Sequence, residues 1–110
     1  MDIGDLAAYG ADVEQGLARC MGNEGLYLRL VEKAKGQPEF DALASALAEQ
    51  RLHDAFEAAH ALKGALANLA ITPLLAPVVE ITELLRAETE MDYSDLLGQI
   101  MRERERLCAL

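Results

Sequence analysis

The sequence predicts an all-α protein, an antiparallel four-helix bundle preceded by one or two short helices. Ala and Leu together fill 38 of the 110 positions, and both residues have high helix propensity. No segment of four to eight residues combines strand-like alternation with a high content of Val, Ile and Thr. The chain is long enough to bury one core without disulfides or metals, so we expect residues 1–110 to form a single domain.

Two short helices are expected at the start of the chain. Asp2 is a suitable N-cap for a helix that ends near Gly10. Asp12 is a suitable N-cap for the next helix, with Gln15 three residues later in the capping-box position. Gly22 is typical of the residue at which such a helix stops.

The middle of the chain predicts two longer helices. Asn23 is expected to cap a helix that stops at Gly36, and Pro38 suits the first turn of the next one. The stretch from Pro38 to Leu69 could form one helix of about 32 residues, but bundle helices are usually shorter. We therefore expect a break near residues 49–51, although no strong capping residue marks it.

Three further helices are expected, over about residues 52–69, 72–87 and 92–108. Thr72 and Pro73 predict the start of the second as its N-cap and first helical residue. Pro77 lies early enough in this helix to remove only one backbone hydrogen bond. Asp92 is expected to cap the last helix. The connections are short, which favours antiparallel neighbours.

The charge of the chain excludes several classes of partner. The 19 acidic and 10 basic residues give a formal net charge of −9, whereas sequence-independent binding to DNA or RNA needs a basic surface. The same charge disfavours an anionic membrane surface, and no apolar run approaches the roughly 18 residues of a membrane span. Residues 1–5 are acidic, unlike a secretory signal. We therefore expect a cytoplasmic protein without nucleic-acid or membrane partners.

The two cysteines predict neither a disulfide framework nor a zinc site. Cys20 and Cys108 are too few and too far apart for either, and unpaired thiols are usual in a reducing cytoplasm. His53 and His60 lie two helical turns apart, or about 10 Å along the axis, which is too far for two ligands of one metal. We expect no bound metal and no cofactor.

The most informative segment surrounds His60. On a helical wheel with about 100° per residue, the apolar side of this helix lies opposite His60. Residues on that side are Ala55, Ala58, Leu62, Ala65 and Leu69. His60 is therefore expected to face solvent. Lys63 lies about 60° to one side and Gly64 about 40° to the other, while His53, Phe56 and Ala67 share the face of His60.

These residue types suit phosphoryl transfer to and from His60. A neutral imidazole is a nucleophile near pH 7, and Lys63 places a positive charge one turn away, where an attached anion would lie. Gly64 would let a second protein approach closely, and a mid-helix Gly costs roughly 1 kcal/mol relative to Ala. No nucleophile–base pair and no glycine-rich phosphate loop supports a hydrolase.

Residues 59–65, Ala-His-Ala-Leu-Lys-Gly-Ala, resemble the core motif of the histidine-containing phosphotransfer (HPt) domain family. The resemblance extends over about residues 10–87. Residues 12–19 and 22–27 look like the family's first two helices, and Asn68 precedes an apolar residue as it often does in the family. The following helix matches at its apolar and basic positions, which are Leu74, Ile81 and Arg86.

The resemblance implies a four-helix bundle that carries a phosphoryl group between the aspartates of response-regulator receiver domains. His60 would be phosphorylated, Lys63 would offset the phosphoryl charge, and Gly64 would leave room for the receiver. Phe56, Ala67 and His53 would contribute to the docking face. The expected partners are receiver domains and a hybrid sensor histidine kinase. The receiver would supply Mg²⁺, and this chain, expected to be a monomer, would have no kinase or hydrolase activity of its own.

Two positions depart from the family pattern. Ala70 stands where Gly is common, and Arg51 stands where an acidic residue often begins the helix. Neither departure affects His60, Lys63 or Gly64.

Other interpretations of these residues remain open at this point. His60 could be an ordinary surface histidine, His53 a solvated side chain or a second acceptor, and Gly64 a packing glycine. Phe56 could belong to the core or to a docking surface. The alternative function is a non-catalytic adaptor that binds a receiver or kinase and inhibits it.

Overall fold

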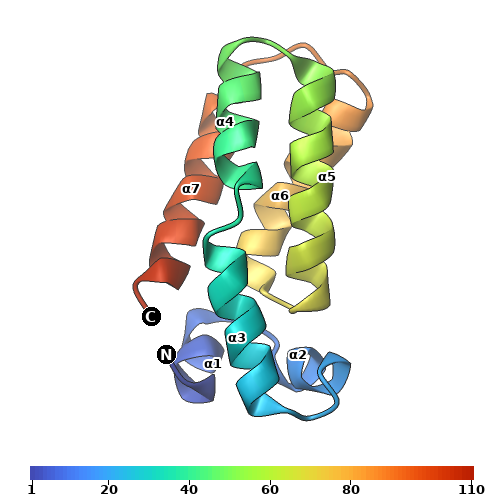
Figure 1. Ribbon diagram of the computed structural model, residues 1–110. Coiled ribbons are helices and arrows are strands. Elements are labelled where there is room, and N and C mark those ends of the chain that lie inside the picture. Colours follow the sequence, from blue (N-terminus) through green and yellow to red (C-terminus); the bar gives the residue numbers. More distant parts are fainter.

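Seven helices and no strand form the structure, a computed structural model that describes all of residues 1–110 (Figure 1). The helices are α1 (Ile3–Tyr9), α2 (Val13–Arg19), α3 (Glu24–Lys35), α4 (Glu39–Ala48), α5 (Leu52–Asn68), α6 (Thr72–Arg86) and α7 (Ser94–Cys108). The predicted all-α class is therefore confirmed. No helix is both long enough and apolar enough to cross a membrane.

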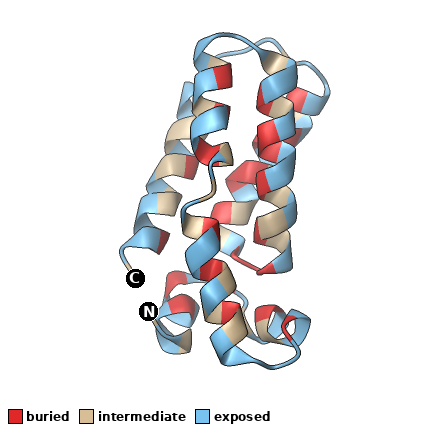
Figure 2. Cartoon of the chain, viewed as in Figure 1, coloured by how far each residue is buried: buried red, intermediate tan, exposed pale blue.

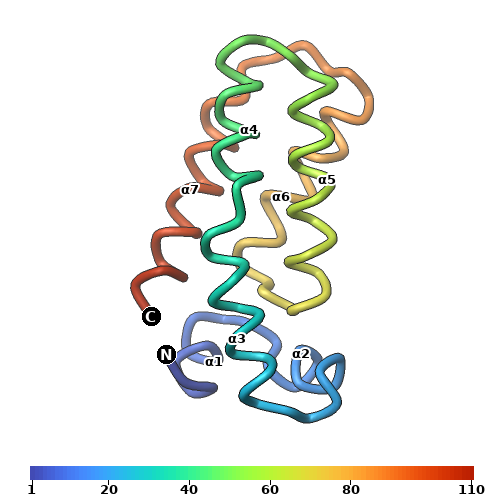
Figure 3. The backbone as a smooth tube through the Cα atoms, viewed as in Figure 1, coloured from blue at the N-terminus to red at the C-terminus, as the bar shows by residue number.

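The bundle consists of α4, α5, α6 and α7, which run alternately up and down (Figure 1). Helix α5 packs against both α4 and α6, and α6 also packs against α7. Helix α3 leads into α4 along the same side of the molecule, with a bend at the connection (Figure 3). The short helices α1 and α2 lie at the lower end, so the molecule is elongated and measures 41 × 23 × 19 Å.

The three predicted N-caps at the start of the chain are confirmed. The side chains of Asp2, Asp12 and Asn23 each accept a hydrogen bond from the backbone N–H three residues later, at 2.7, 3.1 and 3.0 Å respectively. Gly10 and Gly22 follow helices with φ of 114° and 72°, a left-handed conformation that Gly adopts without steric penalty. Local capping chemistry therefore determines this part of the fold.

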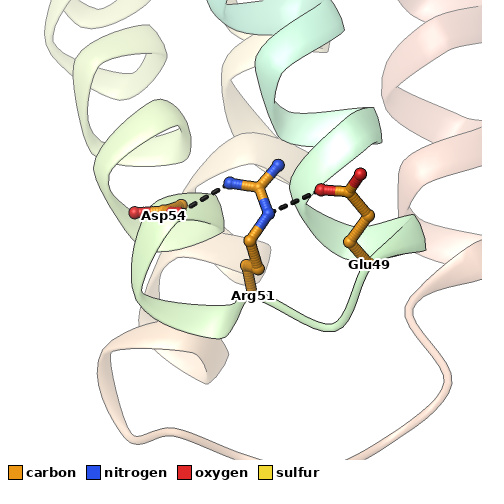
Figure 4. Close-up of polar contacts among 3 residues, drawn as sticks. All are labelled: Glu49, Arg51 and Asp54. Carbon is orange, nitrogen blue, oxygen red and sulfur yellow. Dashed lines mark hydrogen bonds and ion pairs between the residues drawn. The ribbon is translucent and has the colours of Figure 1, made fainter.

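The predicted break between two bundle helices is also confirmed. Helix α4 ends at Ala48, Gln50 has a φ of 57°, and α5 begins at Leu52 without a side-chain cap. Arg51 bridges the turn by donating to the carboxylates of Glu49 and Asp54, each at 2.6 Å (Figure 4). These groups are exposed, so the ion pairs contribute little to stability.

The predicted N-cap roles of Thr72 and Asp92 are corrected by the structure. Thr72 is the first residue of α6, and its hydroxyl donates to the carbonyl of Ala70 at 3.3 Å, so it caps no helical N–H. Asp92 precedes the N-cap position of α7, which Tyr93 occupies. Its carboxylate still accepts from the backbone N–H of Ser94 at 2.9 Å and from the Ser94 hydroxyl, and these bonds lower the pKa of Asp92.

One hydrophobic cluster connects the bundle to the N-terminal helices. It runs from Leu6 in α1 to Leu107 in α7, and the red segments in Figure 2 mark where buried residues lie along the helices. Tyr27 of α3 is fully buried, and its hydroxyl donates to the carbonyl of Leu69 at 2.8 Å. Burial raises the pKa of Tyr27. Of the two cysteines, Cys20 is buried and Cys108 is exposed, and both are unpaired.

The contact between α2 and α3 makes Gly16→Ala a sharp test of the packing. A Cβ at Gly16 would lie 2.4 Å from Cζ of Tyr27, and the fully buried ring is held by its hydrogen bond to Leu69. We expect this substitution to lower the free energy of unfolding by about 1–3 kcal/mol, as overpacking does, in urea titrations monitored by circular dichroism.

Gly25→Ala is the matched control for this substitution. Gly25 lies in the first turn of α3, and the nearest atom to its Cβ would be at 3.5 Å, an ordinary contact. This variant should be as stable as the wild type or more stable, because Ala has the higher helix propensity. Equal stability of the two variants would contradict the packing argument.

Candidate functional site

His60 lies near the middle of α5 on the side that faces solvent. The opposite side of α5 contributes Ala55, Ala58, Leu62 and Leu69 to the core, each less than 9% exposed, while Ala65 is half-buried. The helical wheel therefore placed the imidazole correctly. The His60 side chain accepts and donates no hydrogen bond within the protein, so no protein group occupies either ring nitrogen.

The aromatic ring of Phe56 stacks on the imidazole of His60 from one turn earlier. The ring centroids are 5.5 Å apart with an interplanar angle of 19°. Phe56 is half-buried, and the Arg86 guanidinium of α6 lies 5.0 Å from its ring centroid, within cation–π range. Phe56 is therefore both a packing residue and part of the exposed face around His60.

Lys63 brings a positive charge to the same face, and its ammonium group is paired with a carboxylate of the neighbouring helix. Its Nζ lies 3.5 Å from Oε1 of Glu83 on α6. The other oxygen of Glu83 lies 3.3 Å from Nε of Arg86. The surface next to His60 thus holds two cations that share one carboxylate.

Gly64 is exposed, and its missing side chain leaves open space. A Cβ built at Gly64 would meet no atom within 4 Å, so no neighbouring helix requires glycine there. This contradicts the interpretation of Gly64 as a packing glycine. The absent side chain instead opens the surface beside His60 to an approaching molecule.

The two other residues predicted on this face differ in their surroundings. Ala67 is half-buried, and its carbonyl accepts a hydrogen bond from the Arg19 guanidinium, which α2 brings against the end of α5. His53 is exposed, and its Nε2 lies 3.8 Å from Oε1 of Glu57. No aromatic ring stacks on His53, and it lacks the Lys and Gly that follow His60.

Sequence reasoning missed Glu83 and Arg19 as parts of this face. Both lie on helices other than α5, and a helical wheel describes only the residues of one helix. Glu83 is three residues before Arg86, a position already matched to the family, so the spacing on α6 was the available signal. No comparable signal pointed to Arg19.

The site is an open surface rather than a cleft. A hollow of about 730 Å³ at the other end of α5 from Asn68 contains none of the predicted site residues. Its apolar lining comes from α4, the start of α5, the α6–α7 connection and α7, through Ala44, Leu47, Ala48, Leu52, Met91, Tyr93 and Leu97. An exposed nucleophile on a flat face suits a macromolecular partner better than a small substrate, which needs a concave site. No three His, Cys, Asp or Glu side chains gather in a metal-binding arrangement.

Comparison with known proteins identifies the family. Residues 33–109 match the family model described as Hpt domain, which is more than half of the chain. The match begins later and ends later than the resemblance over residues 10–87, because it omits α2 and most of α3 and includes α7. No curated protein and no solved structure matches the chain.

Proposed function

Because the chain belongs to the Hpt domain family, whose members take part in phosphotransfer in two-component phosphorelays, we propose that it relays a phosphoryl group through a phosphohistidine at His60. The observation that supports this most directly is the exposed imidazole of His60 beside Lys63 and the open surface at Gly64. The donor and acceptor are the aspartates of receiver domains.

The transfer step requires little from this chain beyond a nucleophile and a charge. A ring nitrogen of His60 uses its lone pair to form the N–P bond while the P–O bond of the receiver's aspartyl phosphate breaks. The electron pair of that bond leaves with the aspartate carboxylate. The imidazole keeps its proton on the other nitrogen and carries a positive charge until that proton passes to solvent. Lys63 offsets the charge of the phosphoryl group.

The docking face proposed for the receiver surrounds His60 on α5. Phe56 supplies an aromatic surface, Gly64 the space for close approach, and Ala67 and His53 the edges. Aromatic residues are enriched at protein interfaces. We infer that receiver domains and a hybrid sensor histidine kinase are the partners, that residues 1–110 act as one monomeric unit, and that the chain has no kinase or hydrolase activity of its own.

The test is phosphotransfer from purified receiver domains that have been phosphorylated beforehand. We expect label on the wild-type protein from at least one receiver of a panel, and we expect the bond to be labile in acid and stable in base. Receivers that bind the protein without transferring label would contradict the relay and favour an adaptor that inhibits its partner.

Replacing Lys63 with Ala should weaken transfer without preventing it. Loss of the ammonium group removes one favourable charge from the phosphorylated state, and an interaction of this kind at a partly exposed site contributes about 0.5–1 kcal/mol. We expect transfer to slow, or the half-life of the phosphorylated protein to shorten, by about two- to fivefold. Time courses with a radiolabelled receiver measure both quantities.

Lys33→Ala is the charge-matched control. Lys33 is exposed on α3 and forms no ion pair in the structure, so its loss changes the net charge equally without touching the site. If the Lys63 variant and this control behave alike, Lys63 does not have the proposed role.

A further inference from the structure

Glu83 holds both cations that flank the proposed phosphorylation site. One oxygen of its carboxylate lies 3.5 Å from Nζ of Lys63, and the other lies 3.3 Å from Nε of Arg86. The side chain of Glu83 is 53% exposed and that of Lys63 is 34% exposed. A single carboxylate on α6 thus positions one cation of α5 and one of its own helix.

Arg86 connects this pair of ion bridges to the imidazole. Its guanidinium lies 5.0 Å from the ring centroid of Phe56, and Phe56 stacks on His60 with the ring centroids 5.5 Å apart. Glu83 therefore belongs to a continuous set of contacts that includes Lys63, Arg86, Phe56 and His60. The contacts that lead from Glu83 to the imidazole therefore run through Arg86 and Phe56.

Phosphorylation of His60 would create a second anion that competes with the Glu83 carboxylate for the ammonium group of Lys63. The phosphoryl group carries negative charge close to Lys63, and Glu83 is a like charge that already occupies the same ammonium group. Two negative charges on one face repel each other. A single cation shared between two anions also stabilises each anion less than it would stabilise one anion alone. The carboxylate thus stabilises the unphosphorylated arrangement and opposes the phosphorylated one.

We propose that Glu83 is a positioning residue that acts through Lys63 and Arg86 and lowers the stability of the phosphohistidine. The proposal rests on the phosphotransfer function of His60. In the unphosphorylated protein, Glu83 holds Lys63 one helical turn from His60 and holds Arg86 near the ring of Phe56. In the phosphorylated protein, Lys63 turns from Glu83 to the phosphoryl group, and the carboxylate, which then keeps only Arg86 as a partner, favours return of that group to an aspartate.

A purely structural role for the Glu83 ion pairs predicts a different result. Exposed ion pairs contribute little to folding, so replacing Glu83 should leave thermal unfolding nearly unchanged. The positioning role instead predicts a change in how the phosphoryl group is distributed between the receiver and this protein, with no change in thermal unfolding.

The experiment compares Glu83→Gln with Glu105→Gln. Glu105 is exposed on α7 and forms no ion pair, so both variants lose one negative charge and only the first disturbs the site. Each protein is equilibrated with a phosphorylated receiver, and the labelled fraction is measured along with the half-life of the phosphorylated form. We expect the Glu83 variant to shift the equilibrium toward the phosphorylated protein by about three- to tenfold relative to wild type, from the loss of one nearby like charge, and the control to shift it by less than twofold.

A double variant tests the connection through Lys63. When Lys63 is already Ala, Glu83→Gln should have a smaller effect on the equilibrium than in the wild type, because one of the two cations is gone. An undiminished effect would overturn the coupling. If the wild type is labelled and the Glu83 and Glu105 variants behave identically, the role of Glu83 is overturned while the phosphotransfer function stands. Absence of label on wild type from receivers that bind it would remove the phosphotransfer function, and this inference with it.

Discussion

Replacing His60 with Gln should abolish phosphoryl acceptance from every receiver that labels the wild-type protein. The amide side chain has no nucleophilic lone pair of comparable reactivity, so the N–P bond cannot form. His60 is exposed and forms no side-chain hydrogen bond in the protein, so its replacement should change the free energy of unfolding by less than about 0.5 kcal/mol. Parallel measurements of label incorporation and of thermal unfolding check the two parts of this expectation.

His53→Gln is the control for this result. His53 is the only other histidine of the chain, and it lies on the same helix near Glu57, without a Lys and Gly at the spacing found after His60. We expect this variant to accept label as the wild type does. If label persists in the His60 variant and disappears in the His53 variant, the acceptor is His53 and the proposed role of His60 is contradicted.

The helices near the start of the chain were predictable because their signals are local. Asp2, Asp12 and Asn23 each satisfy a backbone N–H three residues away, and such a contact depends only on the adjacent sequence. The same rule failed at Thr72, whose hydroxyl donates to the carbonyl of Ala70 instead. Ala70 has a φ of 53°, and this turn brings its carbonyl within reach of the hydroxyl. The sequence predicted a break between residues 69 and 72, but it did not predict which hydrogen bond the Thr72 hydroxyl would make there.

The candidate site was predictable as far as it lies on one helix. His60, Lys63 and Gly64 belong to α5, so the helical repeat alone determines their angular relation. The pairing of Lys63 with Glu83 depends on how α6 packs against α5, including its distance and rotation. Residues of two helices meet according to side-chain packing along the whole interface, and a single sequence does not specify that rotation. The same reason applies to Arg19, which reaches Ala67 from α2.

The open surface at Gly64 leads to a prediction in which stability and function change in opposite directions. Gly64→Gln adds a long polar side chain to a helical position where a Cβ meets no atom within 4 Å. The free energy of unfolding should rise by about 0.5–1 kcal/mol, because Gln has a higher helix propensity than Gly. Transfer from a phosphorylated receiver should nevertheless fall by about tenfold or more, because the new side chain occupies the space through which the receiver reaches His60.

Ser45→Gln and Gly64→Ala complete this test. Ser45 is exposed on α4, whereas His60, Lys63 and Gly64 lie on α5, so we expect a Gln there to leave transfer unchanged. Gly64→Ala should gain stability as Gly64→Gln does, but with only one added carbon atom it should lose less activity. If transfer depends on access of the receiver to His60, the transfer rate must fall in the order Gly, Ala, Gln at position 64. The free energy of unfolding must not fall in the same series. A Gln variant that transfers at the wild-type rate would show that the receiver does not approach across Gly64, and the docking face would then have to lie on the Lys63 side of His60.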